Sequence, residues 1–402
     1  MIFGFKPEKV RDDFEILKTG VIYFDSACMS LKPRQVVEKV NEYYHKYPGC
    51  AGRSAHRIAD LVTHEVDEAR AEIAKLVKAN GRHEIVFTRN TTEGLNLVAH
   101  GLRLKDGDEV VISDKEHNSN LIPWLKLKKD IGIKLKIVKS NADNTLDIER
   151  LEKAIGPRTK LVSIVHRSNM DGVTNPAKEI CKIAHKKGTL VMLDGAQSVP
   201  GMEIDVHDIG VDLLSFSGHK MLGPTGTGVL YGKKEILEKL DQFIVGGETV
   251  KNSTYEDFVI EDVPHRFEAG LQDYAGIVGL GEASRYLRKI GLSAVAKHEA
   301  RLNKVISEGL ATERKIELIG PVDPAQRSGI YSFNIHGMDP HHVSKMLDVS
   351  KKILTRSGAH CVHSWFNKRN MKGSARASLY LYNTEDEAQK LVEEVKKIAK
   401  MV

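Results

Sequence analysis

Residues 160–194 read KLVSIVHRSNMDGVTNPAKEICKIAHKKGTLVMLD and hold two continuous apolar runs on either side of an amphipathic stretch. Apolar runs without alternation are typical of strands buried on both faces, and PAKEICKIAHKKG between them has the spacing of a helix. Similar runs recur from about residue 84, in EIVFTRN, EVVISD, KLKIV, DLLSFSGHK and TGVLYG, with the helical pattern TEGLNLVAHGL after the first. The pattern predicts an α/β fold with a mostly parallel sheet covered by helices on both faces.

The pattern changes after about residue 285. A long helix-like stretch covers residues 282–313, the strands GIYSFNIH and ARASLYLYN follow, and DEAQKLVEEVKKIAKMV predicts a closing helix. We therefore expect a large domain at residues 16–285 and a smaller α+β domain at residues 286–402. Residues 1–15 are expected to form an N-terminal arm that packs with the small domain.

Composition narrows the functional classes. The 402 residues carry 60 Lys and Arg against 54 Asp and Glu, with 6% aromatic residues and no dense basic tract, which does not favour a nucleic-acid partner. No apolar run approaches the roughly 18 residues that span a bilayer, and the first residues soon become charged. Four cysteines without a CxxC pair form no disulfide framework. We expect a cytoplasmic protein without membrane or nucleic-acid partners.

Polar clusters follow several of the predicted strands. They are Thr91 and Thr92, Asn169, residues 194–197 and residues 217–220. Ligands of parallel sheets collect at the carboxyl ends of the strands. These clusters therefore predict a ligand site, and a cleft between the two domains is the expected place for it.

Lys220 lies in SFSGHKMLGPTGTG, residues 215–228, at the end of a predicted strand and in small, mostly uncharged surroundings. Burial lowers the pKa of a lysine, and a neutral amine can form an imine with an aldehyde. A single lysine at a strand end is more often a solvated surface charge. The glycines that follow lack the GxxxxGK[ST] spacing of a phosphate-binding P-loop.

The segment around Lys220 resembles the Schiff-base lysine motif of the pyridoxal-phosphate enzymes of aminotransferase class V, and the resemblance covers nearly the whole chain. It implies the PLP-dependent transferase fold type I, with a seven-stranded sheet, and pyridoxal 5'-phosphate as cofactor. By this resemblance Lys220 binds the aldehyde, Asp194 faces the pyridine nitrogen, and His117 stacks on the ring and shuttles protons. Asn169 and Gln197 match the partners of the phenolic oxygen. The implied phosphate contacts are Thr91, Thr92, Ser217 and His219. Taken singly, most of these residues have commoner structural roles, such as a helix cap for Thr91, Thr92 or Asp194.

RSGAHC, residues 356–361, resembles the R-[TS]-G-x-H-C segment of SUF-type cysteine desulfurases and selenocysteine lyases, and GSARASLYLYNTEDE resembles a further segment of that branch. The resemblance implies that Cys361 takes sulfur from L-cysteine as a persulfide and that L-alanine leaves. Arg376, with Arg356 and Asn169, is implied to bind the substrate. It also implies a homodimer that passes sulfur to an acceptor protein or thiol, for iron–sulfur clusters or other products. We expect the neighbouring His360, His363 and Arg356 to lower the pKa of the Cys361 thiol.

Other interpretations stay open at this point. Selenocysteine and cysteine sulfinate share the carboxylate and amine of cysteine, so a selenocysteine lyase or cysteine sulfinate desulfinase fits almost equally well. A class V aminotransferase or epimerase would leave Cys361 incidental, and Cys361 would then be a buried structural cysteine. A zinc site on His360, Cys361 and His363 lacks a second ligand cluster, so no metal is expected. A sulfur carrier or scaffold without catalysis is the remaining alternative.

The chain departs from the family pattern at two places. Leu271 stands where the family has a threonine that reaches the partner subunit's phosphate, and Gln272 is the candidate substitute. Arg167 stands where the family has a smaller or apolar residue. Among the other cysteines, Cys28 lies in a segment that borders the substrate pocket in the family, and we interpret Cys50 and Cys181 as structural.

Overall fold

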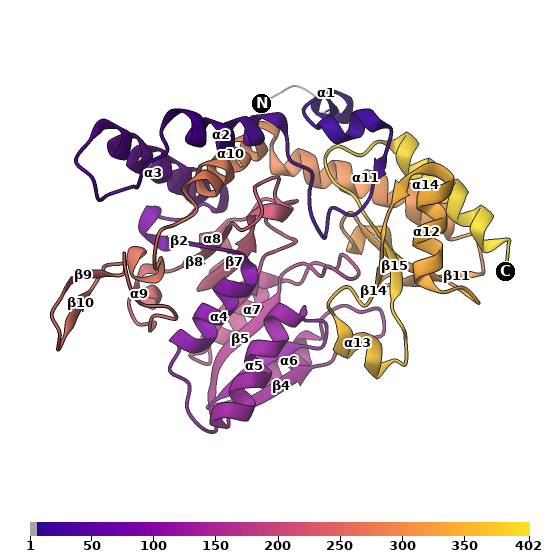
Figure 1. Ribbon diagram of the computed structural model, residues 1–402. Helices are drawn as coiled ribbons and strands as arrows, with labels where there is room; N and C mark the ends of the chain where they lie inside the picture. The colour runs from indigo at the N-terminus through magenta and orange to yellow at the C-terminus, as the bar shows by residue number, and fades with distance from the viewer. Residues whose placement is uncertain (1–5) are drawn as a thin grey trace.

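A computed structural model describes residues 6–402. Its main sheet has seven strands in the order β2-β8-β7-β6-β5-β3-β4, and β8 alone runs antiparallel to its neighbours. The mostly parallel seven-stranded sheet expected from the sequence is thereby confirmed (Figure 1). The strands are β2 Ile85–Thr88, β3 Glu109–Ser113, β4 Lys134–Val138, β5 Thr159–Val165, β6 Leu190–Asp194, β7 Leu213–Ser217 and β8 Gly228–Gly232.

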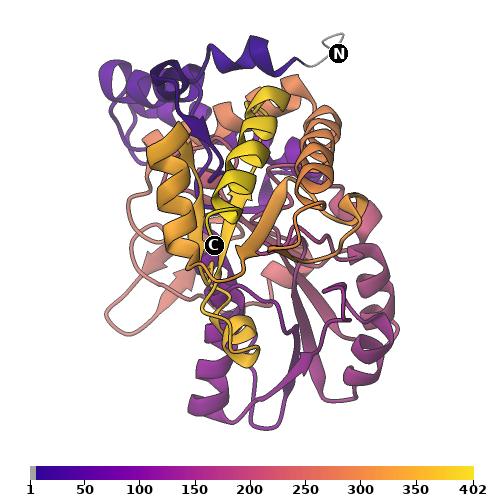
Figure 2. The same cartoon turned by 90° about the vertical axis from the view of Figure 1, so that its right-hand side faces the viewer.

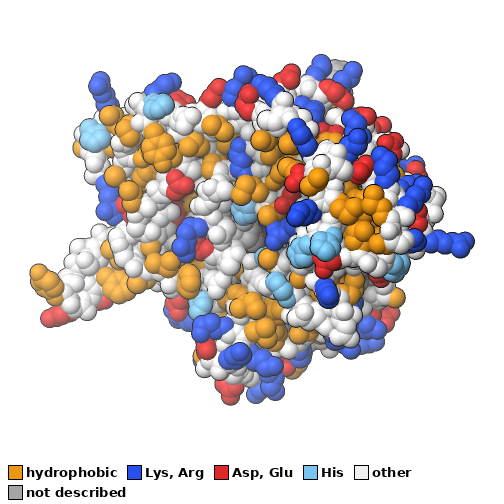
Figure 3. Space-filling view, turned by 45° about the vertical axis from the view of Figure 1, so that its right-hand side comes forward, with side chains coloured by type: hydrophobic (Ala, Val, Ile, Leu, Met, Phe, Trp, Pro, Cys, Tyr) orange, Lys and Arg blue, Asp and Glu red, His pale blue; other side chains and the backbone are white. Residues whose placement is uncertain are grey.

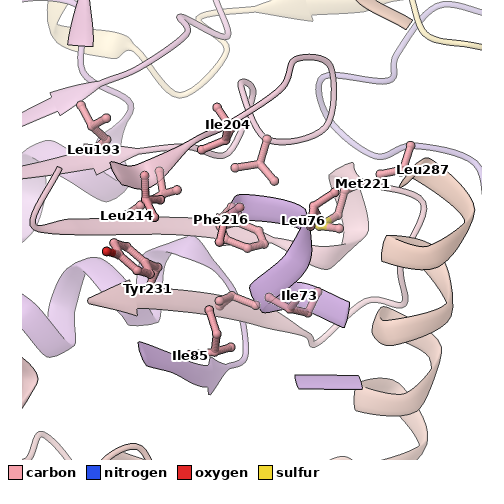
Figure 4. Close-up of a cluster of buried hydrophobic side chains, with 14 of the residues drawn as sticks. Ile73, Leu76, Ile85, Leu193, Ile204, Leu214, Phe216, Met221, Tyr231 and Leu287 are labelled. Atoms are coloured by element: carbon pink, nitrogen blue, oxygen red, sulfur yellow. The ribbon is translucent and has the colours of Figure 1, made fainter. Parts of the chain in front are cut away.

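Successive residues of the central strands enter two different cores, because side chains alternate across a strand. Leu214 and Phe216 of β7 lie in one cluster with Ile73 of the long helix α3 (Figure 4), whereas Leu213 lies in a second cluster with Trp124 of α5. The sheet is thus buried on both faces, which explains its uninterrupted apolar strands. The helices of this part are α2 Arg34–Lys46, α3 Arg57–Val77, α4 Thr91–Gly101, α5 Asn118–Ile131, α6 Ile148–Ala154, α7 Ala177–His185, α8 Val206–Ile209, α9 Lys234–Leu237 and α10 Tyr274–Ile290.

A second sheet follows in the C-terminal part of the chain. It has the order β11-β12-β15-β14, and α11, α12 and α14 pack together beside it (Figures 1 and 2). Ala375 and Ala377 of β15 enter the core under these helices, so the intervening Arg376 faces the opposite side, toward the large sheet. The elements are α11 Leu292–Leu310, β11 Ile316–Ile319, β12 Ile330–Ile335, α12 Pro340–Lys351, β13 Ile353–Leu354, β14 Arg356–Gly358, α13 His363–Lys368, β15 Ser374–Ser378 and α14 Glu385–Ala399.

The N-terminal segment joins this second sheet region. β1, Ile22–Tyr23, pairs in parallel with β13, and Arg11 at the end of α1, Pro7–Arg11, forms an ion pair of 2.8 Å with Glu387 of α14. Residues 1–5 of the expected arm lie outside the described residues. The expected domain boundary at residue 285 stays a prediction, and it falls inside α10.

Two features of the predicted elements differ in the structure. The helix-like stretch 282–313 is divided between α10 and α11, because Gly291 between them has φ of +90°, which no helix interior adopts. The strand expected at residues 375–383 ends at Ser378.

A hairpin of β9, Val250–Ser253, and β10, Phe258–Ile260, projects from the body of the molecule (Figures 1 and 3). Within residues 6–402, none of the helices is both long and apolar enough to cross a membrane. The remaining short helices are η1 Glu15–Thr19, η2 Arg82–Glu84, η3 Gly218–Lys220, η4 His265–Phe267 and η5 Pro324–Gln326.

Candidate active site

One pocket lies where the carboxyl ends of β5, β6 and β7 meet the second sheet. It has a cavity volume of about 250 Å³. The structure brings together in its lining every residue that the sequence predicted for cofactor or substrate, namely Thr91, Thr92, His117, Asn169, Asp194, Gln197, Ser217, His219, Lys220, Arg356 and Arg376. Cys361 is not among these lining residues, but its Sγ lies 3.9 Å from Nη2 of Arg356, which is.

Asp194 and Lys220 form the floor of the pocket. Asp194 is the last residue of β6 and is 3% exposed, and its Oδ1 accepts a hydrogen bond of 3.0 Å from the Ala196 N–H. Lys220 ends the short helix η3 that follows β7. Burial raises the pKa of Asp194 and lowers the pKa of Lys220, and the attraction between the two groups opposes both shifts. A lowered pKa increases the fraction of free amine on Lys220 at neutral pH.

The N-terminus of α4 faces one end of the pocket. Ser217 Oγ accepts a hydrogen bond of 2.8 Å from the Thr91 N–H and lies 2.6 Å from Thr91 Oγ1. The helix cap is Asn90, whose side chain accepts from the Glu93 N–H, so the alternative of a threonine cap does not hold. Thr91 and Thr92 lie in the first turn, where the Thr91 hydroxyl pairs with Ser217 and Thr92 Oγ1 lies 2.7 Å from Ser119 Oγ. Hydroxyl groups at a helix N-terminus are suited to an anion such as phosphate.

The backbone of α4 comes this close to the sheet because residue 228 at the start of β8 is a glycine. A Cβ atom there would lie 2.5 Å from the Cα of Asn90.

His117 caps helix α5, and its Nδ1 accepts a hydrogen bond of 3.1 Å from the Ser119 N–H. Burial, with the nearby positive charges of Lys220 and Arg356, lowers the pKa of His117 to about 3. The ring is therefore neutral, and its proton lies on Nε2 because Nδ1 is the acceptor. His219 is also neutral, because burial and the charge of Lys220 lower its pKa to about 4.

Two amides line the middle of the pocket. Gln197 Nε2 donates to the Ala27 carbonyl at 2.7 Å, and Asn169 Nδ2 donates to the His360 carbonyl at 2.8 Å. Asn169 Oδ1 is buried and has no hydrogen-bond partner among residues 6–402. A buried polar atom that lacks a partner costs free energy, so a bound ligand with a donor is the expected partner.

Arg356 and Arg376 lie directly opposite each other on β14 and β15, so both side chains point to the same face of the second sheet. Arg376 is 1% exposed and donates to the Asn169 carbonyl at 2.9 Å and to Asp25 Oδ1 at 3.1 Å. Its Nε has no partner among the described residues. The alternative of a surface charge on an edge strand does not hold, because β15 is an inner strand. Two adjacent guanidinium groups with spare donors are suited to a carboxylate.

The turn that carries Cys361 has an unusual backbone. His360 and Cys361 both have positive φ, of +49° and +60°, which costs roughly 1–2 kcal/mol for each residue that is not glycine. The turn is held by a hydrogen bond of 2.7 Å from the Asn118 N–H to the Cys361 carbonyl, and by the Asn169 amide on the His360 carbonyl. Cys361 is half-buried, and its Sγ lies 3.9 Å from Nη2 of Arg356.

The expectation that both histidines tune Cys361 needs a correction. The His360 ring is buried and its Nε2 pairs with Ser374 Oγ at 2.8 Å, and burial with the two arginines lowers its pKa to about 2. A neutral His360 cannot stabilise a thiolate by charge. His363 is exposed and its Nδ1 pairs with the Asn118 side chain at 2.9 Å. Arg356 supplies the positive charge beside the Cys361 sulfur.

The zinc alternative also finds no support, because residues 6–402 contain no group of three side chains that could hold a metal.

The structure adds residues that the sequence did not single out. Asp25 pairs with Arg376, and the main chain of Asn118 holds the Cys361 turn. Only their nearness to Cys28 and His117 in the sequence could have indicated them. Arg167, one of the two departures from the family pattern, is buried, its Nη1 lies 3.8 Å from Glu299 Oε2, and the residue lines the pocket.

At the other departure, Leu271 is 70% exposed. The amide of Gln272 donates to the carbonyls of Ala269 and Gly270, so it is engaged locally.

Comparison with known proteins agrees with this geometry. The family model described as aminotransferase class-V matches residues 22–391, so the chain belongs to this family. A probable cysteine desulfurase of Methanothermobacter thermautotrophicus is 40% identical over 407 residues, covering 100% of both chains. One of Halalkalibacterium halodurans is 40% identical over 388 residues, covering 96% of this chain and 95% of the relative. The apo structure of the cysteine desulfurase from Thermococcus onnurineus NA1 superposes with a TM-score of 0.96 at 37% identity, covering 100% of both chains.

Proposed function

We propose that this chain is a pyridoxal-phosphate-dependent cysteine desulfurase, which takes sulfur from L-cysteine, releases L-alanine and holds the sulfur as a persulfide on Cys361. The observation that carries the proposal is the meeting of a buried lysine and carboxylate with two arginines and a half-buried cysteine around one pocket. Relatives named cysteine desulfurase that match nearly the whole chain support the enzyme class and the cofactor.

The pocket fits the cofactor at three points. The Asp194 carboxylate would hold the pyridine nitrogen, and the N-terminus of α4, with Thr91, Thr92, Ser217 and His219, would hold the phosphate. Asn169 and Gln197 would face the phenolic oxygen. When bound, the cofactor supplies an aldehyde for amino groups and an electron sink for the charge that develops at the substrate's α-carbon.

Arg376 and Arg356 would bind the substrate carboxylate, because their donors converge on one side of the pocket. This fixes the α-carbon relative to Lys220. The Lys220 amine, whose pKa burial lowers, acts as the base that removes the α-proton. His117 covers the pocket with a neutral ring whose Nε2 can donate or return a proton.

Cys361 then acts as the nucleophile. Its thiolate attacks the sulfur of the substrate, a bond forms between the two sulfurs, and the bond from sulfur to the substrate's β-carbon breaks. The electron pair of the broken bond stays with the β-carbon, which takes up a proton and becomes the methyl group of L-alanine. The guanidinium of Arg356 places a positive charge beside the reacting sulfur.

The direct test is alanine release from L-cysteine by the purified protein with pyridoxal phosphate, in parallel with Lys220→Ala and Cys361→Ala. We expect both variants to lose at least 100-fold in rate, in the range of a lost acid–base or nucleophilic group. If Cys361→Ala forms alanine as fast as the parent, Cys361 is incidental and the proposed desulfurase mechanism is wrong. If the parent forms none, a sulfur carrier or scaffold is correct.

Selenocysteine and cysteine sulfinate, offered in the same assay, rank the substrates by kcat/KM. A preference for either over L-cysteine would replace the desulfurase assignment by a lyase or desulfinase.

We further propose that the chain is a cytoplasmic homodimer that passes its sulfur to an acceptor protein or thiol, for iron–sulfur clusters or other products. Support for a dimer comes from exposed apolar side chains along residues 243–271. We call these side chains the hairpin patch, because this segment includes the projecting β9–β10 hairpin (Figure 3). Exposed apolar surface of this kind, part of it on a projecting hairpin, is typical of an interface. The patch consists of Phe243, Ile244, Val245, Tyr255, Phe258, Val259 and Leu271. Sedimentation analysis that finds only monomer at micromolar concentration would contradict the dimer.

A further inference from the structure

The pocket contains a second cysteine for which the proposed reaction has no role. Cys28 lies in its wall, and Cys28 Sγ accepts a hydrogen bond of 2.7 Å from Nη1 of Arg356. Nη2 of the same guanidinium is 3.9 Å from the Sγ of Cys361. One arginine therefore lies between the two thiols, although they are more than 300 residues apart in the sequence.

The backbone around Cys28 is held in place on both sides. Cys28 N–H donates to the Asp25 carbonyl at 3.0 Å, Ala27 N–H donates to Ser378 Oγ at 3.0 Å, and the Ala27 carbonyl accepts from Gln197. The turn is thus anchored to both the second sheet and the pocket floor. Cys28 is half-buried, so its sulfur is accessible from the pocket.

The side chains around Cys28 are basic. Arg356 contacts its sulfur directly, and Cys28 is close enough to Lys220 and Arg376 to act on the pKa of each, opposing the lowering by burial. Cys28 therefore has the surroundings of a reactive cysteine, whereas Cys181 is buried, and burial raises the pKa of its thiol to about 12.

We propose that Cys28 is a second sulfur-accepting thiol, which takes the outer sulfur from the Cys361 persulfide across the shared Arg356 guanidinium. This inference rests on the proposed function, because it requires the persulfide on Cys361. A persulfide extends Cys361 by one sulfur atom, about 2 Å, toward the thiol that must attack it.

The transfer balances without an oxidant or reductant. The Cys28 thiolate attacks the outer sulfur of the Cys361 persulfide, a new bond joins that sulfur to Cys28, and the bond between the two sulfurs of the persulfide breaks. Cys361 leaves as a thiolate. The proton on the outer sulfur moves with that sulfur to Cys28. Arg356 contacts both the attacking and the leaving sulfur and so stabilises the negative charge throughout. Cys361 is then free to accept a second sulfur.

The sequence makes the transfer easy to follow, because each of the four cysteines falls on a different tryptic peptide. Cys28 lies in residues 19–34, Cys361 in residues 357–368, and Cys50 and Cys181 in residues 47–53 and 179–182. The holoenzyme is mixed with L-cysteine without an acceptor, stopped by an alkylating reagent at successive times, and digested. The mass of one added sulfur then locates the persulfide.

We expect the persulfide first on the Cys361 peptide and later on the Cys28 peptide, and about two sulfane sulfurs per chain at the end. Cys28→Ser keeps an acceptor for Arg356 but cannot carry sulfur, so it should stop at about one per chain. Cys361→Ser should leave the Cys28 peptide unmodified. Cys50→Ser, at an exposed cysteine away from the pocket, is the matched control and should behave as the parent.

Persulfide on Cys361 alone in the parent overturns the relay and leaves the desulfurase intact, with Cys28 only positioning Arg356. Sulfur on Cys28 in Cys361→Ser, or on Cys28 before Cys361 in the parent, also overturns it, since Cys28 would then accept directly from substrate. Absence of both alanine and persulfide in the parent overturns the proposed function itself.

Discussion

Asn118→Pro should slow sulfur transfer to Cys361 without weakening substrate binding. Asn118 is the first residue of helix α5, a position that tolerates proline because its N–H has no partner within the helix. His117 before it has φ of −57° and ψ of 147°, the extended conformation that a following proline requires. The substitution therefore removes the N–H that binds the Cys361 carbonyl, together with the side-chain contact to His363, and leaves the helix in place.

The magnitude follows from that one hydrogen bond. Leaving a carbonyl without its donor costs about 1–3 kcal/mol, and the bond helps to hold two residues in the left-handed region. If the loss of this hydrogen bond raises the activation free energy of persulfide formation by the same 1–3 kcal/mol, the rate falls about 5- to 150-fold. Single-turnover formation of persulfide on the Cys361 peptide measures the rate, and the KM for L-cysteine should stay within about 2-fold because Arg376 is untouched.

Asn118→Ala is the matched control, since it removes the side-chain contact with His363 but keeps the N–H. We expect it to keep most of the parent's rate. If proline and alanine at this position give equal rates, the main-chain contact does not hold the Cys361 turn and the reasoning is refuted.

Three further outcomes are expected. Arg376→Lys keeps the positive charge but loses the two parallel donors of the guanidinium. The kcat/KM for L-cysteine should therefore fall about 10- to 100-fold, mainly through a higher KM. An unchanged KM would argue against carboxylate binding by Arg376. Glu268 pairs with Arg70 through two hydrogen bonds of 2.6 and 2.9 Å, and although burial opposes it, this pairing lowers the pKa of Glu268 to about 2. The ionised carboxylate therefore contributes about 3 kcal/mol of stability above pH 4.5, and this contribution is lost as the pH falls toward 2. Denaturant unfolding of Glu268→Gln at pH 7 should show a free energy of unfolding about 3–5 kcal/mol lower than that of the parent. If the hairpin patch is the dimer interface, replacing both Phe258 and Val259 by Glu should weaken self-association more than 100-fold in sedimentation experiments. Self-association equal to that of the parent would exclude the hairpin as the interface.

The strands of the large sheet could be predicted from the sequence because they are buried on both faces. β4 was expected at residues 134–138, where the structure has it, and the other expected strands differ from the observed ones by a few residues at their ends. The second sheet was harder. Residues 379–383 have the apolar character of a strand, but the Tyr380 N–H pairs with the Asn383 side chain, so the chain turns there. Such a local side-chain competitor for the strand's hydrogen bonds leaves little trace in hydropathy.

The lining of the pocket could be predicted because the family motifs occur at strand ends. Three features could not. That Arg356 and Arg376 share a face depends on the register of β14 against β15, which no sequence pattern states. That His360 turns toward Ser374 depends on a contact across the same pair of strands. The place of Cys28 beside Arg356 depends on the parallel pairing of β1 with β13, which brings the N-terminal segment against the second sheet.

These three features belong to one arrangement. A histidine beside the nucleophile would carry charge only below its own pKa, so it would couple sulfur transfer to pH, whereas a guanidinium keeps its charge throughout the physiological range. The structure places the neutral His360 under the turn and the charged Arg356 beside the sulfur. Because Arg356 lies on a paired strand rather than in the turn, its charge stays fixed relative to the pocket when Cys361 gains or loses a sulfur atom. The second sheet thus supplies a constant positive charge to whichever thiol carries the negative one.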